Sequence, residues 1–73
     1  MSALNTAEVR ITLNGTAATT PARTVLELVE LHQLSALKIA TAVNGRFVPA
    51  AGRATTALND GDRVEIVSPR QGG

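Results

Sequence analysis

The chain has 73 residues, and its seven basic and six acidic side chains leave a net charge of +1. A chain of this length forms one small domain, whose limited core leaves no room for a deep substrate cavity and so argues against a free-standing enzyme. It has no cysteine, one histidine, one aromatic residue and no run of like charges, which argues against a metal site and against nucleic-acid binding.

The stretch EVRITLNGTAATT, residues 8–20, predicts a β-hairpin. Apolar and polar side chains alternate along VRITL, which is the period of a half-buried strand. Asn14-Gly15 follows, and both residues tolerate a positive φ, so we expect a two-residue turn into a second strand that ends before Pro21.

Residues 25–33 predict the main helix. Thr24 and Glu27 have the spacing of a capping box, which marks the first turn of a helix. Apolar side chains then recur with the helical period and form a stripe that we expect to face a sheet. The residues at this spacing are Val25, Leu28, Val29 and His32, and Leu26 and Leu31 widen the stripe.

The second half of the chain predicts three more strands. Residues 39–43 alternate in polarity, and Asn44-Gly45 marks a tight turn into a short strand at 46–48, which precedes a proline and is expected at an edge of the sheet. Residues 50–58 predict a loop with one helical turn at most. The last strand follows at 63–67, with Val64 and Ile66 facing the core.

A turn rich in Asn, Asp and Gly, residues 59–62, precedes that last strand. Asp60 and Asp62 are close enough for a pair of catalytic carboxylates. They flank Gly61, however, and such residues are typical of tight turns, so we interpret them as turn formers.

The expected order of elements is β-β-α-β-β-β. A helical crossover between the opening hairpin and the later strands favours a parallel contact between the first and the last strand in the middle of the sheet. We therefore predict an α+β protein of the β-grasp (ubiquitin-like) kind, with one main helix packed on a mixed sheet of four or five strands. The β-grasp domain spans residues 8–67, after a disordered N-terminal arm at 1–7 and before a flexible C-terminal diglycine tail at 68–73.

The chain resembles the ThiS family, the sulfur carrier proteins of thiamine biosynthesis, over nearly all of residues 8–73. The resemblance lies in the order and spacing of VRITLNG, TVLELVE, AVNGRFVP, NDGDRVEIV and the terminal Gly-Gly. Pro69 departs from this pattern and is more like the small subunit of molybdopterin synthase, a related carrier. The departure leaves the pathway open between the two.

The resemblance implies that the carboxylate of Gly73 is adenylated by a ubiquitin-activating-type adenylyltransferase and converted to a thiocarboxylate by a persulfide sulfur donor. The thiocarboxylate then gives its sulfur to thiazole synthase. In this role the protein is a co-substrate rather than an enzyme, it binds no cofactor, and ATP is used by the partner. We expect a monomer when free, located in the cytoplasm, since the sequence shows neither a membrane-spanning run nor a signal-peptide pattern.

The predicted binding residues of the tail are Pro69, Arg70, Gln71 and Gly72. Six extended residues reach roughly 20 Å, enough to enter a partner's active site. Without Cβ atoms, the two terminal glycines can pass a narrow channel, and the proline limits the freedom of the exit. Arg70 and Gln71 either contact the activating enzyme or serve only as solubilising surface.

The outward side of the sheet is the predicted docking surface. In the expected strand order, Ala40 and Ala42 lie near Phe47 and Val67 and form an apolar patch. We expect Arg46, Arg63 and Arg70 at its rim. The alternative for Phe47, as the single aromatic side chain, is a place in the core.

Three other functions remain open at this point. The same chemistry could deliver sulfur to molybdopterin or to a cysteine precursor. Alternatively, Gly73 could form an isopeptide bond to a target protein, as in a ubiquitin-like modifier, although the single lysine, Lys38, makes side-chain-linked polymers hard to build. In a plain interaction module, by contrast, the terminal glycines would have no role.

Overall fold

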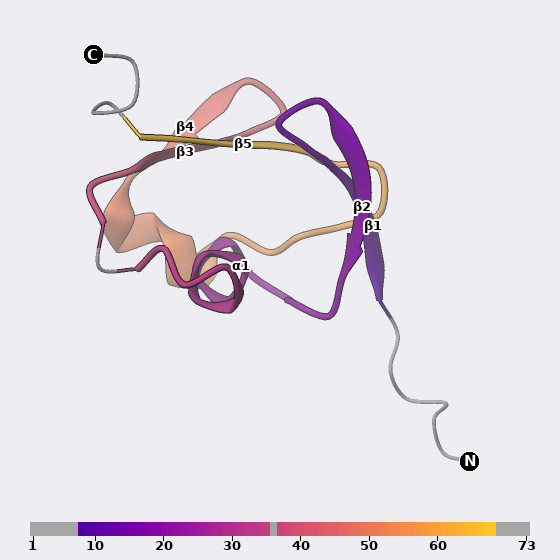
Figure 1. Ribbon diagram of the computed structural model, residues 1–73, viewed down its shortest axis with the longest axis horizontal. Helices are drawn as coiled ribbons and strands as arrows, with labels where there is room; N and C mark the ends of the chain where they lie inside the picture. The colour runs from indigo at the N-terminus through magenta and orange to yellow at the C-terminus, as the bar shows by residue number, and fades with distance from the viewer. Residues whose placement is uncertain (1–7, 36, 69–73) are drawn as a thin grey trace.

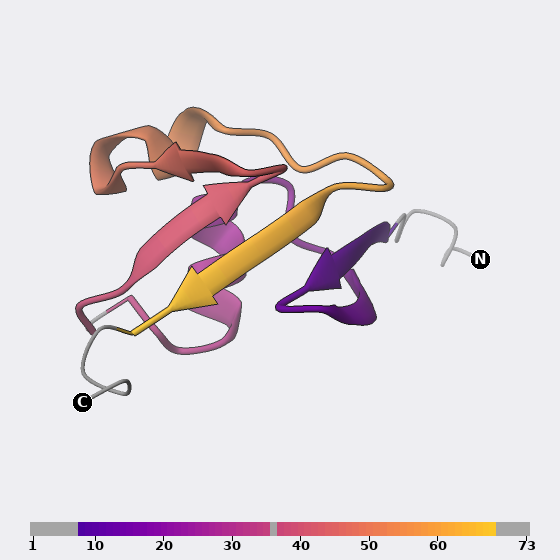
Figure 2. The same cartoon turned by 90° about the horizontal axis from the view of Figure 1, so that it is seen from above.

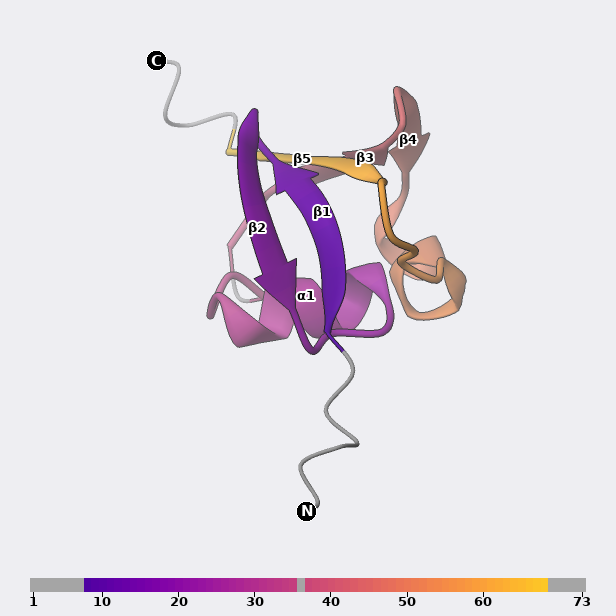
Figure 3. The same ribbon diagram turned by 90° about the vertical axis from the view of Figure 1, so that its right-hand side faces the viewer.

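The structure, a computed structural model, describes residues 8–35 and 37–68 and shows an α+β fold with one main helix and a five-stranded mixed sheet. The helix lies across one face of the sheet, as seen edge-on (Figure 1) and from the side (Figure 3). The elements are β1 (Val9–Leu13), β2 (Thr16–Thr20), α1 (Val25–Leu31), β3 (Ala40–Val43), β4 (Arg46–Val48), the 3-10 helix η2 (Ala50–Thr55) and β5 (Arg63–Val67).

The strand order is β2-β1-β5-β3-β4, so the last strand of the chain is the central one. β1 and β5 run parallel, and the other neighbouring pairs are antiparallel. Viewed from above, β5 passes over α1 between β3 and the first hairpin (Figure 2). The predicted central parallel pair is confirmed. The crossover through α1 returns the chain as β3 in the direction of β2, and β5, which pairs antiparallel with β3, therefore runs in the direction of β1.

The start of α1 follows the predicted capping box. The Oγ1 atom of Thr24 accepts a hydrogen bond of 3.2 Å from the backbone N–H of Glu27, and the Glu27 carboxylate accepts one of 2.6 Å from the N–H of Arg23. The first bond satisfies a backbone donor that the first turn of a helix leaves without an intrahelical partner, and the second holds the residue that precedes the cap.

The helix ends two residues before the predicted boundary, because Gln33 adopts a left-handed conformation with φ of 60°. The N–H of Gln33 donates to the carbonyl of Glu30, and that of Leu34 donates to the carbonyl of Val29. This is the bonding of a Schellman motif, which usually carries glycine at the left-handed position.

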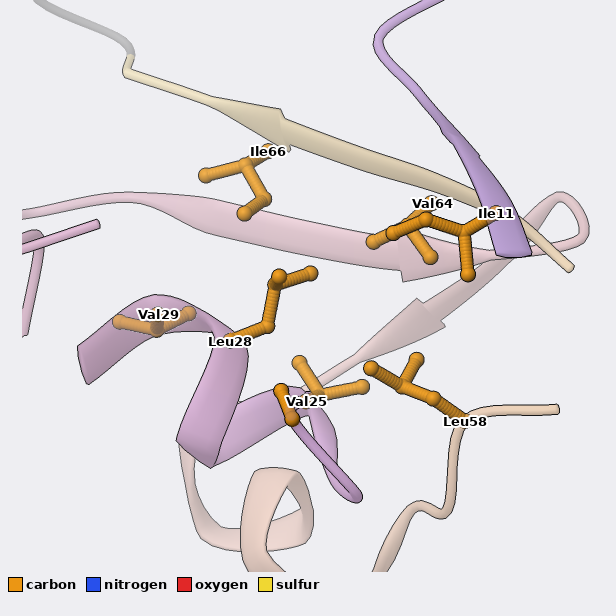
Figure 4. Packing of buried hydrophobic residues seen from close by; sticks show 8 residues of the cluster. Ile11, Val25, Leu28, Val29, Leu58, Val64 and Ile66 are labelled. Carbon is orange, nitrogen blue, oxygen red and sulfur yellow. The ribbon is translucent and has the colours of Figure 1, made fainter. Parts of the chain in front are cut away.

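One hydrophobic core lies between α1 and the sheet, as Figure 4 shows for the residues it labels. Leu28 and Val25 of the helix and Val64 of β5 are completely buried. Leu31 was predicted to widen the same apolar stripe, but it is 53% exposed, because it lies on the side of the helix that carries Glu27 and Glu30. The buried cluster consists of Ile11, Ala22, Val25, Leu28, Val29, Leu58, Val64 and Ile66.

The predicted loop at 50–58 contains the 3-10 helix η2, whose six residues make about two turns rather than the single turn expected. Its Arg53 side chain donates to the carbonyl of Ile39 at 2.9 Å and to the hydroxyl of Thr41 at 3.3 Å. That hydroxyl is itself buried and donates to the carbonyl of Val48 at 2.8 Å. These hydrogen bonds hold the segment between β4 and β5 against β3.

Candidate functional site

The predicted reactive tail continues directly from the central strand. β5 ends at Val67, and Ser68 is the last residue that the structure describes. The predicted site residues Pro69, Arg70, Gln71, Gly72 and Gly73 therefore lie outside the described residues, as does the predicted arm at 1–7. The described part of the candidate site is the end of β5 together with the outward face of the sheet.

Phe47 lies on the outward face and is 68% exposed. It pairs with Ala42 across the β3–β4 hairpin, while the next residue, Val48, pairs with the buried Thr41 and is itself buried. The alternative that Phe47 fills the core is therefore wrong, because the register gives the inward position to Val48. An aromatic side chain exposed to this degree is available to a partner.

Val67 shares the outward face with Phe47. It lies opposite Ala40, it is 55% exposed, and it alternates along β5 with the buried Val64 and Ile66. Ala42 of β3 lies between Phe47 of β4 and the exposed Glu65 of β5, and Ala40 lies beside Val67. This apolar patch, made of Ala40, Ala42, Phe47 and Val67, is named the sheet patch below.

Of the two described arginines that were predicted at the rim of the sheet patch, only one lies on the outward face. Arg63 alternates outward on β5, opposite Thr12 of β1. Arg46 instead pairs with Val43, which pairs in turn with the buried Val64, so the register places Arg46 on the face toward the helix. There it lines an open hollow of about 530 Å³.

The two Asn-Gly turns hold both ends of β5 through their asparagine side chains. Asn14 has a φ of 50°, and its carboxamide accepts from the N–H of Ile66 at 2.8 Å and donates to the carbonyl of the same residue at 3.1 Å. Asn44 has a φ of 52°, and its carboxamide accepts from the N–H of Arg63 at 2.9 Å and donates to the Asp62 carboxylate at 2.9 Å. The sequence interpretation gave both asparagines only their role in the turns.

The comparisons with known proteins agree with this geometry. The model of the ThiS family matches residues 11–73. The chain belongs to the ThiS family. The chain is also similar to the crystal structure of a thiamine biosynthesis protein (ThiS) from Geobacter metallireducens, with 28% identity, a TM-score of 0.70, and coverage of 82% of this chain and 93% of that one. No curated protein matches it.

ThiS-family proteins are sulfur carriers for thiamine biosynthesis rather than enzymes, and the family implies a C-terminal thiocarboxylate and partners in that pathway. The family and the β-grasp fold predicted from the sequence are thereby confirmed.

The acidic turn of this ThiS-family chain has a structural role. The Asp60 carboxylate accepts a hydrogen bond of 2.8 Å from the N–H of Arg10, and the Asp62 carboxylate accepts one of 2.9 Å from the N–H of Asn59. Gly61, between them, has a φ of 92°. The interpretation of the two aspartates as turn formers is therefore supported by their bonding.

Two further observations concern what the described residues can hold. Within residues 8–35 and 37–68, no group of three or more histidine, aspartate or glutamate side chains is placed to bind a metal ion. In the same ranges, no helix is long and apolar enough to cross a membrane.

Proposed function

We propose that the C-terminal carboxylate of Gly73 is the sulfur-carrying group and that its thiocarboxylate supplies the sulfur of the thiazole in thiamine biosynthesis. The observation that carries the proposal is the family match, which includes the two terminal glycines and runs to residue 73. The position of β5 supports it, since the central strand leads directly into the tail.

Activation has to come first, because a carboxylate is a poor electrophile. A partner adenylyltransferase joins the carboxylate to AMP, with release of pyrophosphate from ATP, and so gives the acyl carbon a good leaving group. The terminal sulfur of a protein persulfide then attacks the acyl carbon and AMP leaves. A second thiol breaks the sulfur–sulfur bond and frees the thiocarboxylate.

The carrier contributes access to its carboxylate rather than a catalytic side chain. Its sequence contains no cysteine, so the persulfide and the second thiol both come from partners. Residues 68–73 span roughly 20 Å when extended, and Gly72 and Gly73 can pass where a side chain would clash. Pro69 restricts the exit of the tail, and Arg70 and Gln71 contact the activating enzyme.

The sheet patch is the surface on which the partners dock. Phe47 and Val67 offer large exposed apolar side chains, and Val67 lies directly before the tail, so a partner that covers the patch also receives the tail. The same surface serves the adenylyltransferase and thiazole synthase in turn. Because activation consumes ATP, we place the activation of the carrier and its sulfur transfer in the cytoplasm.

Intact mass spectrometry tests the proposal. The purified chain is incubated with a ubiquitin-activating-type adenylyltransferase, ATP and a persulfide donor, and the mass of the chain is followed. We expect replacement of one oxygen by sulfur at the C-terminus, and no change in a control chain that lacks Gly72 and Gly73. An unchanged mass with pyrophosphate released and adducts formed on other proteins would instead indicate a protein modifier.

The assignment to the thiamine pathway is tested by measuring sulfur transfer from the carrier to two candidate acceptor enzymes. The thiocarboxylated chain is offered separately to thiazole synthase and to the large subunit of molybdopterin synthase. We expect sulfur loss with thiazole synthase. Transfer to the molybdopterin enzyme alone would contradict the thiazole assignment while leaving the carrier chemistry intact.

A further inference from the structure

The carboxamide of Asn14 continues the parallel ladder after β1 has turned away from β5. The backbone N–H of Thr12 donates to the carbonyl of Asp62, and that of Asn14 donates to the carbonyl of Val64, both at 2.9 Å. The next β5 groups on this side are the N–H and C=O of Ile66, and both bond to the Asn14 side chain. The carboxamide has one acceptor and one donor group, as a peptide unit does, and takes the place of the next peptide of β1.

On its other edge, β5 is paired with β3 as far as its last residues. β3 pairs Thr41 with Ile66 and Ala40 with Val67, which is the last residue of the strand. Without the Asn14 carboxamide, the end of β5 would be held from the β3 side alone, because β1 ends at Leu13. Asn14 therefore fixes the second edge of the strand immediately before the chain leaves the sheet.

We propose that Asn14 is a positioning residue for activation of the C-terminal carboxylate. This role rests on the proposed function. The carboxylate reaches a partner's active site on a short tail, and the tail begins where β5 stops being held. Anchoring Ile66 keeps the tail short and its starting point constant, so that docking orders fewer residues.

The chain contains a matched control for this role. Asn44 is also the first residue of an Asn-Gly turn, has nearly the same φ, and makes two side-chain hydrogen bonds at β5. Its bonds lie at Asp62 and Arg63, at the beginning of the strand and far along the chain from the tail. Asn14→Gly and Asn44→Gly both keep a residue that accepts positive φ and both remove a carboxamide.

The experiment measures pyrophosphate release by the adenylyltransferase at varied carrier concentration, together with thermal unfolding of each carrier. We expect both variants to lose similar thermal stability. Asn14→Gly should raise KM by about tenfold, the factor that corresponds to ordering about one additional residue on docking, with kcat little changed. Asn44→Gly should leave KM within about twofold of that of the native chain.

Amide hydrogen exchange measures, in the absence of any partner, how firmly the Asn14 side chain holds the N–H of Ile66. We expect faster exchange at Ile66 in Asn14→Gly than in Asn44→Gly. Equal KM values for the two variants, or equal exchange at Ile66, would overturn the positioning role even if the native chain is activated normally. A native chain that is not activated would refute the proposed function, and this role with it. If Asn14→Gly does not fold, Asn14→Asp replaces it, since it keeps an acceptor for the Ile66 N–H but loses the donor.

Discussion

Replacement of Phe47 by alanine is the most direct test of the sheet patch. A phenylalanine side chain buries roughly 200 Å² when fully covered, and Phe47 is 68% exposed in the free chain, which leaves about 140 Å² for a partner to cover. At about 25 cal/mol per Å², this area corresponds to roughly 3.5 kcal/mol, or about 300-fold in affinity. Alanine retains part of the contact, so we expect KM for activation to rise by about 10- to 100-fold.

The same change should have little effect on folding. Phe47 pairs with the small side chain of Ala42 and contributes nothing to the buried cluster. We expect the free energy of unfolding to change by less than about 1 kcal/mol, as measured by urea denaturation. Binding and stability are therefore separable at this position.

Leu31→Ala serves as the control, since Leu31 is 53% exposed at the end of α1, away from the sheet patch. We expect its KM to equal that of the native chain. A native KM for Phe47→Ala, or the same loss in both variants, would refute the assignment of the sheet patch as the docking surface.

Three more predictions concern the tail, the core and the start of the helix. Gly72→Ala should reduce adenylation by about a hundredfold through misplacement of the carboxylate, without a change in melting temperature; a fully active variant would contradict insertion into a narrow channel. Leu28→Ala removes a side chain with no exposed surface and should cost about 2–5 kcal/mol of stability in a thermal melt, whereas a loss below about 1 kcal/mol would contradict the core packing. Thr24→Ala removes the acceptor of the Glu27 N–H and should cost about 1 kcal/mol by urea denaturation, and an unchanged midpoint would count against the cap.

The sequence alone predicted those features whose causes lie within a few residues. Alternation along VRITL and RVEIV, two Asn-Gly turns, and the spacing of Thr24 and Glu27 are local patterns, and the strands, hairpins and helix start that they predict are present. The order of these elements, with a crossover between them, was sufficient to predict the central parallel pair. Residues 50–58 lack a clear period, so their 3-10 helix was predicted only as at most one helical turn.

Features that depend on register required the tertiary structure. In the three-residue strand β4, alternation distinguishes two faces but does not say which one is inside, and a shift of one residue exchanges them. Pairing with β3 directs Val48 inward, which exposes Phe47 and turns Arg46 away from the predicted rim. The four members of the sheet patch could therefore be suggested from the sequence, while strand pairing decided that Phe47 is exposed and that Arg46 lies outside the rim.

The hydrogen bonds that hold β5 were also beyond the sequence. Asn14 and Ile66 are 52 positions apart, and their side-chain-to-backbone bonds form only when the last strand enters the sheet beside the first. The helix end is a similar case, since Gln33 takes the left-handed position without being the glycine that usually marks it. Local sequence determined which elements form, whereas the pairing of distant segments determined which side chains are exposed on the sheet and how the end of β5 is held.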